Sequence, residues 1–159
     1  MRWLEDRLND MLLILLNISL IVLTVCTFLQ VVSRFVFQLP IPWSTDIIRI
    51  SFIYVIFLAV PVLIKLKDHI TIDILLSVLP PKLLKLFEII ITIFILLFSI
   101  ILCYSGYKFM MSSGNQFMPY LRVSMFYVYA VIPFSSLISI FFAGMLLTRE
   151  LKQLVTNSD

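Results

Sequence analysis

The 159-residue chain is poor in the residues that build catalytic and metal sites. It has 2 cysteines, 1 histidine and 3 glycines, and charged residues make up only 13% of it. Cys26 and Cys103 lie in separate apolar runs and form no C-x-x-C pair, so we interpret them as apolar core residues. One histidine excludes a bis-histidine haem within the chain and leaves any metal site short of ligands. We therefore expect no enzymatic activity and no cofactor in this chain.

What the chain has in abundance is long apolar runs. Hydrophobic residues make up 62% of it and the mean hydropathy is +1.11. Residues 11–33, 89–107 and 123–148 carry no charge, and residues 47–64 carry only Arg49. Such runs are close to the roughly 20 apolar residues that a membrane-spanning helix needs. We predict an all-α membrane protein forming a single domain over residues 1–159, with transmembrane helices at about 11–37, 46–65, 83–107 and 124–148.

The ends and connections of these helices can be predicted from charge and proline. Residues 1–10 are mixed in charge and no cleavage site follows the first apolar run, so we predict a retained first helix rather than a signal peptide. Pro40 and Pro42 should end that helix, and Ser44 or Thr45 should cap the next one. Pro61 should kink the second helix. Residues 70–79 are too short to span, and we predict a helix lying along the membrane surface.

The distribution of lysine and arginine predicts the orientation of the chain. Basic residues of short loops gather on the cytoplasmic side of a membrane protein. Eight of the 12 lie on the side that holds both termini, and four lie on the other. The former are Arg2, Arg7, Lys65, Lys67, Lys82, Lys85, Arg149 and Lys152, and the latter are Arg34, Arg49, Lys108 and Arg122. We therefore expect both termini in the cytoplasm, contact with lipid, and no nucleic-acid partner.

Two small groups of polar residues lie between the first and third helices. A hairpin should bring Arg34 close to Asp46 and Arg49, and Asp46 could bridge the two arginines. This cluster either fixes the hairpin at the interface or holds a surface presented to a partner. His69 and Asp73 are four residues apart, on one helix face. They are interpreted as the start of the interfacial helix, as a contact with a partner chain, or as part of a proton relay.

The predicted helices contain no obvious transport site. Their middles lack the ionisable residues or glycine-rich broken segments that carry ions and solutes in membrane transporters. Glu88, the one candidate for a small multidrug carrier, lies at the inner edge of its helix beside Lys85. Polar residues along the first helix suggest instead that it packs against other protein. A scaffold and a self-sufficient small transporter or channel remain the two alternatives.

A set of motifs from Arg34 onward resembles a known family. It comprises R-F-V-F-x-x-P-x-P-W at residues 34–43, Asp46, Arg49, H-I-T-I-D at residues 69–73, and Pro80. Gly106 and Pro133 fit the same pattern. The chain resembles the DctQ-like small permease subunit of tripartite ATP-independent periplasmic (TRAP) transporters over about residues 3–152. It departs from that family at Thr45, where a second acid is common, and at Ala59 and Pro61, where a glycine region is common.

The resemblance implies a partner rather than a site. It implies a bacterial inner-membrane protein that braces a large elevator-type permease subunit, which carries the substrate and Na⁺ sites. A periplasmic binding protein would deliver an organic acid, and the chain is most similar to the branch that handles sialic acid. Lys108 and Arg122 in the outer loop are the candidates for docking that binding protein. Arg34, Trp43, Asp46, Arg49, His69, Asp73, Gly106 and Pro133 are the candidates for structural or partner contacts.

Overall fold

The computed structural model describes the backbone of residues 2–75 and 81–156 and the side chains of residues 5–66 and 86–152. Its helices are α1 (Arg2–Phe35), α2 (Pro42–Leu75), α3 (Pro81–Ser112), α4 (Met125–Tyr129) and α5 (Val131–Thr156). Four segments are long and apolar enough to cross a membrane: Glu5–Phe35, Pro42–Leu66, Leu86–Ser112 and Met125–Lys152. The prediction of an all-α protein with four membrane-spanning helices is therefore confirmed for the described residues.

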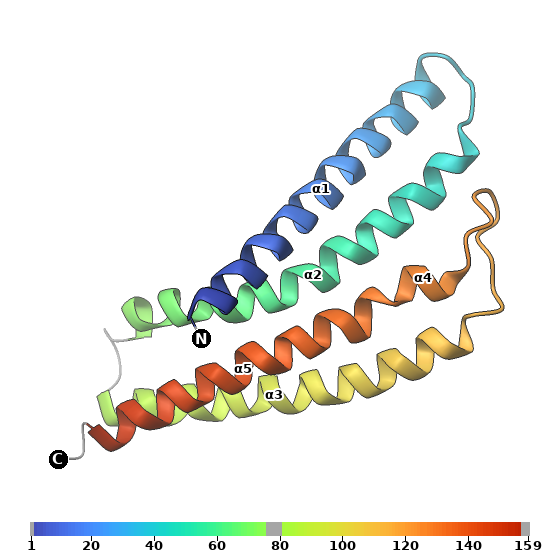
Figure 1. The fold of residues 1–159 in the computed structure, drawn as a ribbon. Coiled ribbons are helices and arrows are strands. Elements are labelled where there is room, and N and C mark those ends of the chain that lie inside the picture. Colours follow the sequence, from blue (N-terminus) through green and yellow to red (C-terminus); the bar gives the residue numbers. More distant parts are fainter. Residues whose placement is uncertain (1, 76–80, 157–159) are drawn as a thin grey trace.

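The helices form two hairpins that meet along one side (Figure 1). Helix α1 packs on α2, α3 packs on α5, and α2 joins the hairpins by packing on α5. Both chain termini lie at one end of the bundle, which we call the terminal end. The α1–α2 and α3–α4 connections lie at the other, which we call the loop end. Helix α1 has the smallest buried share of the four spans, at 6%.

The core lies where α2 meets α5. Leu58 and Val62 of α2 pack with Ile132 and Phe142 of α5 in one buried cluster. Ser135, Ser136 and Ser139 are each 1% exposed, and their hydroxyls donate to backbone carbonyls three or four residues earlier in the chain. Small residues with satisfied hydroxyls let helices approach closely inside a membrane, where apolar burial alone gives little attraction between helices.

The start of α2 differs from the prediction. The helix begins at Pro42, not near residue 46, and Ser44 does not cap it. The Ser44 hydroxyl instead donates to the carbonyl of Ile41 at 2.7 Å. Proline is favoured at the first helical position because its missing N–H would have no helical partner there. Pro42 thus begins the helix, and Thr45 is free to accept a hydrogen bond from Gln30 at 3.1 Å.

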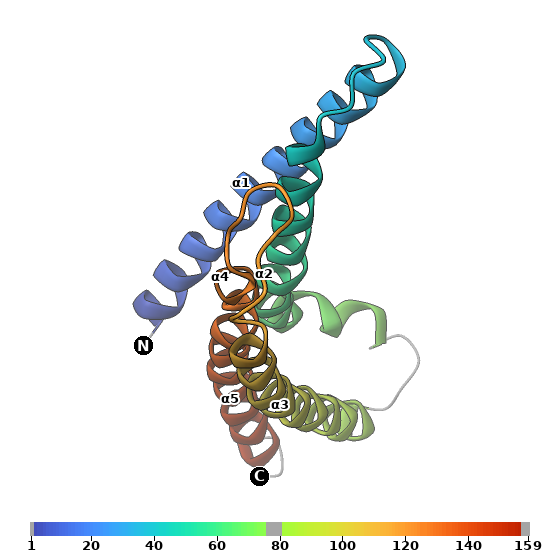
Figure 2. The same ribbon diagram turned by 90° about the vertical axis from the view of Figure 1, so that its right-hand side faces the viewer.

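The helix predicted over residues 70–79 is not separate from α2, and its position along the membrane surface stays a prediction. Residues 70–75 belong to α2, and residues 76–79 lie outside the described part of the chain. No glycine or proline interrupts residues 62–79, so nothing in the sequence ends the helix at the membrane edge. Figure 2 shows the last turns of α2, in light green, bending away from the axis of the helix before them.

The fourth predicted helix is divided in two. Helix α4 ends at Tyr129 and α5 begins at Val131, with Ala130 between them. Pro133 explains the break, because it has no N–H to donate to the carbonyl four residues earlier. Beyond the predicted end at residue 148, α5 continues to Thr156. Helix α3 likewise extends from Pro81 to Ser112, beyond the predicted 83–107 at both ends.

Candidate functional site

At the loop end, one buried carboxylate joins the two hairpins. Asp46, in the first turns of α2, is 3% exposed. Its Oδ2 accepts hydrogen bonds from the backbone N–H groups of Tyr120 and Leu121, both at 2.9 Å. Two amides that donate to one ionised oxygen form charge-assisted bonds, which are stronger than neutral ones. Asp46 therefore fixes the α3–α4 connection against the start of α2.

The α3–α4 connection has its own internal structure. A short antiparallel bridge pairs Phe117 with Ser124, and the Met118 N–H donates to the Val123 carbonyl at 2.9 Å. Ser124 then caps α4, accepting from the N–H of Phe126. Met118 is 1% exposed and packs with Met125 and Val128. The connection is thus held by a small core beneath it as well as by Asp46.

The expected bridge between Asp46 and the arginines is absent. In the part of the chain whose side chains are described, neither Arg34 nor Arg49 forms an ion pair with Asp46, and both are exposed. The buried carboxylate instead accepts hydrogen bonds from loop amides that are distant in sequence. Trp43 is also exposed, at 48%. Arg34 lines a polar cleft of about 500 Å³ with residues from both sides of the hairpin and the loop, including Gln30, Gln38, Thr45 and Tyr120.

The two predicted docking residues lie at the same end of the bundle. Lys108, near the end of α3, is exposed and its Nζ lies 4.8 Å from the centre of the Tyr104 ring. Arg122 is exposed in the α3–α4 connection, with a φ of 53°. With Arg34 and Arg49, they make a loop end whose described basic residues are all exposed. The loop end therefore presents a cationic surface.

The terminal end holds a second polar cluster. Arg149 of α5 donates through Nη2 to both carboxylate oxygens of Glu5 in α1, at 2.7 and 2.8 Å. Glu5 is 6% exposed. Lys65 of α2 pairs with Asp6 at 2.8 Å and also donates to the Glu5 carbonyl. These contacts join the start of α1 to the ends of the spanning parts of α2 and α5.

Sequence reasoning missed this cluster. The sequence analysis counts Lys65 and Arg149 only among the basic residues on the side of both termini, and it assigns no partner to Glu5 or Asp6. A signal was present, since two acids at the start of the first helix face the same side of the membrane as basic residues ending two others. Pairing them needs the relative rotation of three helices, which the sequence does not specify.

Gly106 and Pro133 lie at the closest approach of α3 and α5. A Cβ built on Gly106 would lie 2.5 Å from Cγ2 of Ile132, closer than real side chains come. The thiol of Cys103, one turn earlier in α3, lies 4.0 Å from the Pro133 carbonyl. Glycine is therefore required at residue 106 for this packing.

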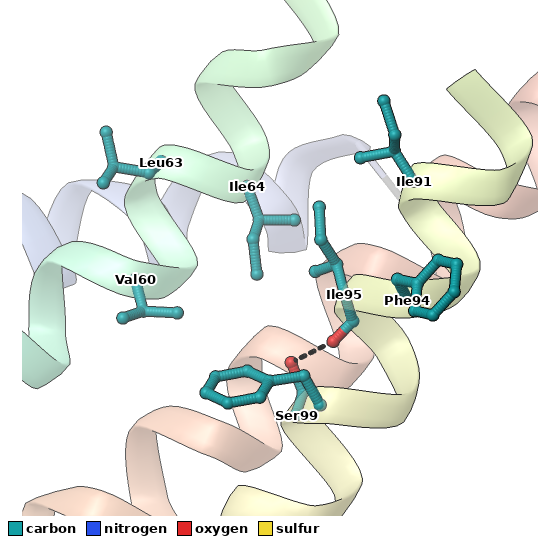
Figure 3. Close-up of a pocket in the computed structure, with 8 residues that line it drawn as sticks. Val60, Leu63, Ile64, Ile91, Phe94, Ile95 and Ser99 are labelled. Atoms are coloured by element: carbon teal, nitrogen blue, oxygen red, sulfur yellow. Dashed lines mark hydrogen bonds between the residues drawn. The ribbon is translucent and has the colours of Figure 1, made fainter. Parts of the chain in front are cut away.

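The groove between α2 and α3 is lined almost wholly by hydrocarbon (Figure 3). Its volume is about 540 Å³, and its lining residues are Val60, Leu63, Ile64, Ile91, Phe94, Ile95, Phe98 and Ser99. The one hydroxyl, of Ser99, donates to the carbonyl of Ile95 at 2.8 Å within its own helix. No polar group in the groove is directed at a solute, so it lacks the chemistry to bind an ion or an organic acid.

The remaining candidate residues give no site in the described part of the chain. No group of three or more His, Cys, Asp or Glu side chains that could hold a metal ion occurs there. The side chains of His69 and Asp73 lie outside the described residues, as does that of Lys85, which lies near Glu88 in the sequence. Their predicted roles stay predictions.

Comparison with known proteins gives one family and two relatives. The family model for tripartite ATP-independent periplasmic transporters, DctQ component, matches residues 23–153. A Haemophilus influenzae (strain Rd) protein assigned as a TRAP transporter small permease is 29% identical over 128 residues, which are 80% of this chain and 77% of the relative. The sialic acid TRAP transporter permease protein SiaT of H. influenzae strain 86-028NP is 36% identical over 56 residues, 35% of this chain and 9% of the relative.

Proposed function

Because the chain belongs to the DctQ family of small permease components of TRAP transporters, we propose that it braces a large permease subunit and helps to dock a binding protein. Under this proposal the chain is an inner-membrane scaffold with both termini in the cytoplasm. The large subunit carries the Na⁺ and substrate sites, and the solute is an organic acid. The likeness to a sialic acid permease makes sialic acid the first solute to test.

The placement of the polar groups carries the scaffold proposal. The ionisable contacts of the described residues lie at the two ends of the bundle, where they join helices to one another. The groove between α2 and α3 is hydrocarbon. A transporter normally places ionisable or broken-helix groups at membrane depth along its solute path. The one helix break described within a span, between α4 and α5, is followed by Ser135, Ser136 and Ser139, whose hydroxyls bond to carbonyls of their own helix, and it carries no ionisable side chain. We therefore assign the solute path to another chain.

The SiaT comparison supports a partner that is a large permease. The stretch similar to this chain is only 9% of that relative, so a segment of this kind forms a small part of a much longer permease protein. The large subunit is accordingly the partner proposed for this chain.

The exposed basic residues of the loop end support docking of a binding protein. A cationic surface attracts a partner with an acidic face and increases its rate of association. Under this proposal, the double charge reversal Lys108→Glu with Arg122→Glu weakens binding of the periplasmic protein and slows uptake, most strongly at low salt. The charge-conserving double variant Lys108→Arg with Arg122→Lys is the matched control and leaves both unchanged.

The docking test uses the chain together with its large subunit in proteoliposomes. Affinity for the binding protein and solute uptake are measured for wild type, the double reversal and the control. If the double reversal leaves both quantities at wild-type values, the docking surface lies elsewhere. If the wild-type chain does not co-purify with the large subunit at all, the scaffold proposal itself fails.

A further inference from the structure

The face of α1 turned away from α2 follows a heptad pattern. Highly exposed apolar side chains recur on it every seven residues, at 59% for Ile14, 62% for Ile21, 68% for Phe28 and 75% for Phe35. Asn17, Thr24 and Val31 follow Ile14, Ile21 and Phe28 by three residues each, and all three are exposed. Asp10, also exposed, precedes Asn17 by seven residues. Alternating spacings of three and four are those of helices that pack side by side with a left-handed crossing. We call Asp10, Ile14, Asn17, Ile21, Thr24, Phe28, Val31 and Phe35 the α1 seam.

Asn17 is the residue of the α1 seam that argues for a protein partner. It lies inside the membrane-spanning part of α1, and its amide forms no hydrogen bond with any described residue. The nearby hydroxyls of Ser19 and Thr24 differ, because each donates to a carbonyl of its own helix at 2.8 Å. An amide facing hydrocarbon without a partner is costly. A neighbouring transmembrane helix can supply the missing hydrogen bond, whereas a lipid tail cannot.

We propose that the α1 seam is the surface on which a transmembrane helix of the large permease subunit packs, with Asn17 hydrogen-bonded to a polar group of that helix. This inference rests on the proposed scaffold function and specifies the surface involved. The bulky Ile and Phe positions alternate along the α1 seam with the smaller Asn17 and Thr24. Side chains of a second helix can pack into the spaces above these smaller residues. A single polar residue in an apolar seam also fixes the register of two packed helices.

Charge disfavours a second copy of this chain as the occupant. In a parallel pair of α1 helices the seam would place Asp10 of one copy opposite Asp10 of the other. Like charges facing each other across an interface destabilise it. The cytoplasmic ends of helices in a polytopic subunit are rich in lysine and arginine, and they offer the opposite charge at this depth.

Photo-crosslinking identifies the occupant directly. A photo-reactive amino acid is placed at Ile21, in the seam, or at Ile101 of α3 as the control; both side chains are 62% exposed. The complex of this chain with its large subunit is irradiated in native membranes. The proposal predicts an adduct with the large subunit from position 21 and much less from position 101. Adducts from position 21 with a second copy of this chain, or with lipid alone, would overturn it.

The role of Asn17 is tested by substitution in the same complex. Asn17→Leu removes the amide at similar size and should lower the fraction of this chain retained by a tagged large subunit by about threefold or more. Asn17→Gln keeps an amide and should restore part of the retention. Ser19→Ala is the control, because that hydroxyl is already satisfied within α1. Wild-type retention of Asn17→Leu, in a complex that does form, contradicts this inference while leaving the scaffold function intact.

Discussion

At the scale of single residues, two buried carboxylates hold the bundle at its opposite ends. Asp46 binds loop amides at the loop end, and Glu5 binds Arg149 at the terminal end. The sequence marked Asp46 as a residue of interest, because an acid near two arginines indicates an ion pair. It could not identify Tyr120 and Leu121 as the donors, since every residue except proline has a backbone N–H and residue type does not show which one donates. Both contacts join parts of the chain that only the folded bundle brings together.

Removing the Asp46 carboxylate should loosen the α3–α4 connection. In the isolated chain, Asp46→Ala deletes the acceptor of two charge-assisted hydrogen bonds and should lower the free energy of unfolding by about 1.5–3 kcal/mol. Asp46→Asn keeps one acceptor oxygen and should lose less. Thermal unfolding in detergent measures both, with the exposed Asp10→Asn expected within about 0.5 kcal/mol of wild type. A melting temperature for Asp46→Ala equal to that of wild type would show that the contact contributes nothing.

The terminal end offers a direct comparison of a buried and an exposed acid. Glu5→Gln removes the charge that faces Arg149 and should cost about 1–3 kcal/mol, less than a fully buried pair because the Arg149 side chain is 38% exposed. Asp6→Asn removes the charge that faces Lys65, but the Asp6 side chain is 67% exposed. That surface pair should contribute under about 1 kcal/mol. Equal losses in chemical or thermal unfolding would contradict this assignment.

At the scale of helices, the sequence identified the spans well and their ends less well. Long uncharged runs fix where a helix crosses the membrane, because charge at membrane depth is costly. Helix ends depend instead on breakers, and α2 continues to Leu75 because residues 62–79 contain none. The break between α4 and α5 was not predicted, although Pro133 was singled out as part of the family pattern.

Gly106 tests the packing of α3 on α5. Gly106→Ala would place its Cβ 2.5 Å from Ile132 Cγ2 and should destabilise the isolated chain by about 1–3 kcal/mol. Gly144→Ala is the matched control, because nothing lies within 4 Å of the position that its Cβ would occupy. That substitution should be neutral or stabilise the helix by up to about 1 kcal/mol. Thermal unfolding in detergent compares the two variants, and equal stabilities would contradict the close packing at Gly106.

A second substitution separates the Gly106 clash from a general loss of stability. Ile132→Ala removes Cγ2 and relieves the closest contact, although it also leaves a small cavity. The double variant with Gly106→Ala should therefore lose less than the sum of the two single losses, as measured by thermal unfolding. Strictly additive losses would mean that residues 106 and 132 do not interact.

At the scale of the whole molecule, the chain leaves much of the apolar surface of its helices exposed. Polar residues along the first helix predicted that it packs against other protein, and in the structure only 6% of the residues in the most apolar stretch of α1 are buried. The rotation of each helix about its axis could not be predicted, because each span is largely apolar on all its faces. The pairing of Glu5 with Arg149 and the alignment of the α1 seam depend on that rotation, so both needed the structure.

The most direct test of the scaffold function is solute flux in proteoliposomes that contain this chain alone. We expect no uptake of sialic acid or another organic acid under an inward Na⁺ gradient. Uptake should appear when the large subunit is added together with the periplasmic binding protein. Solute flux through the isolated chain, dependent on its own residues, would contradict the scaffold function and establish a self-sufficient transporter.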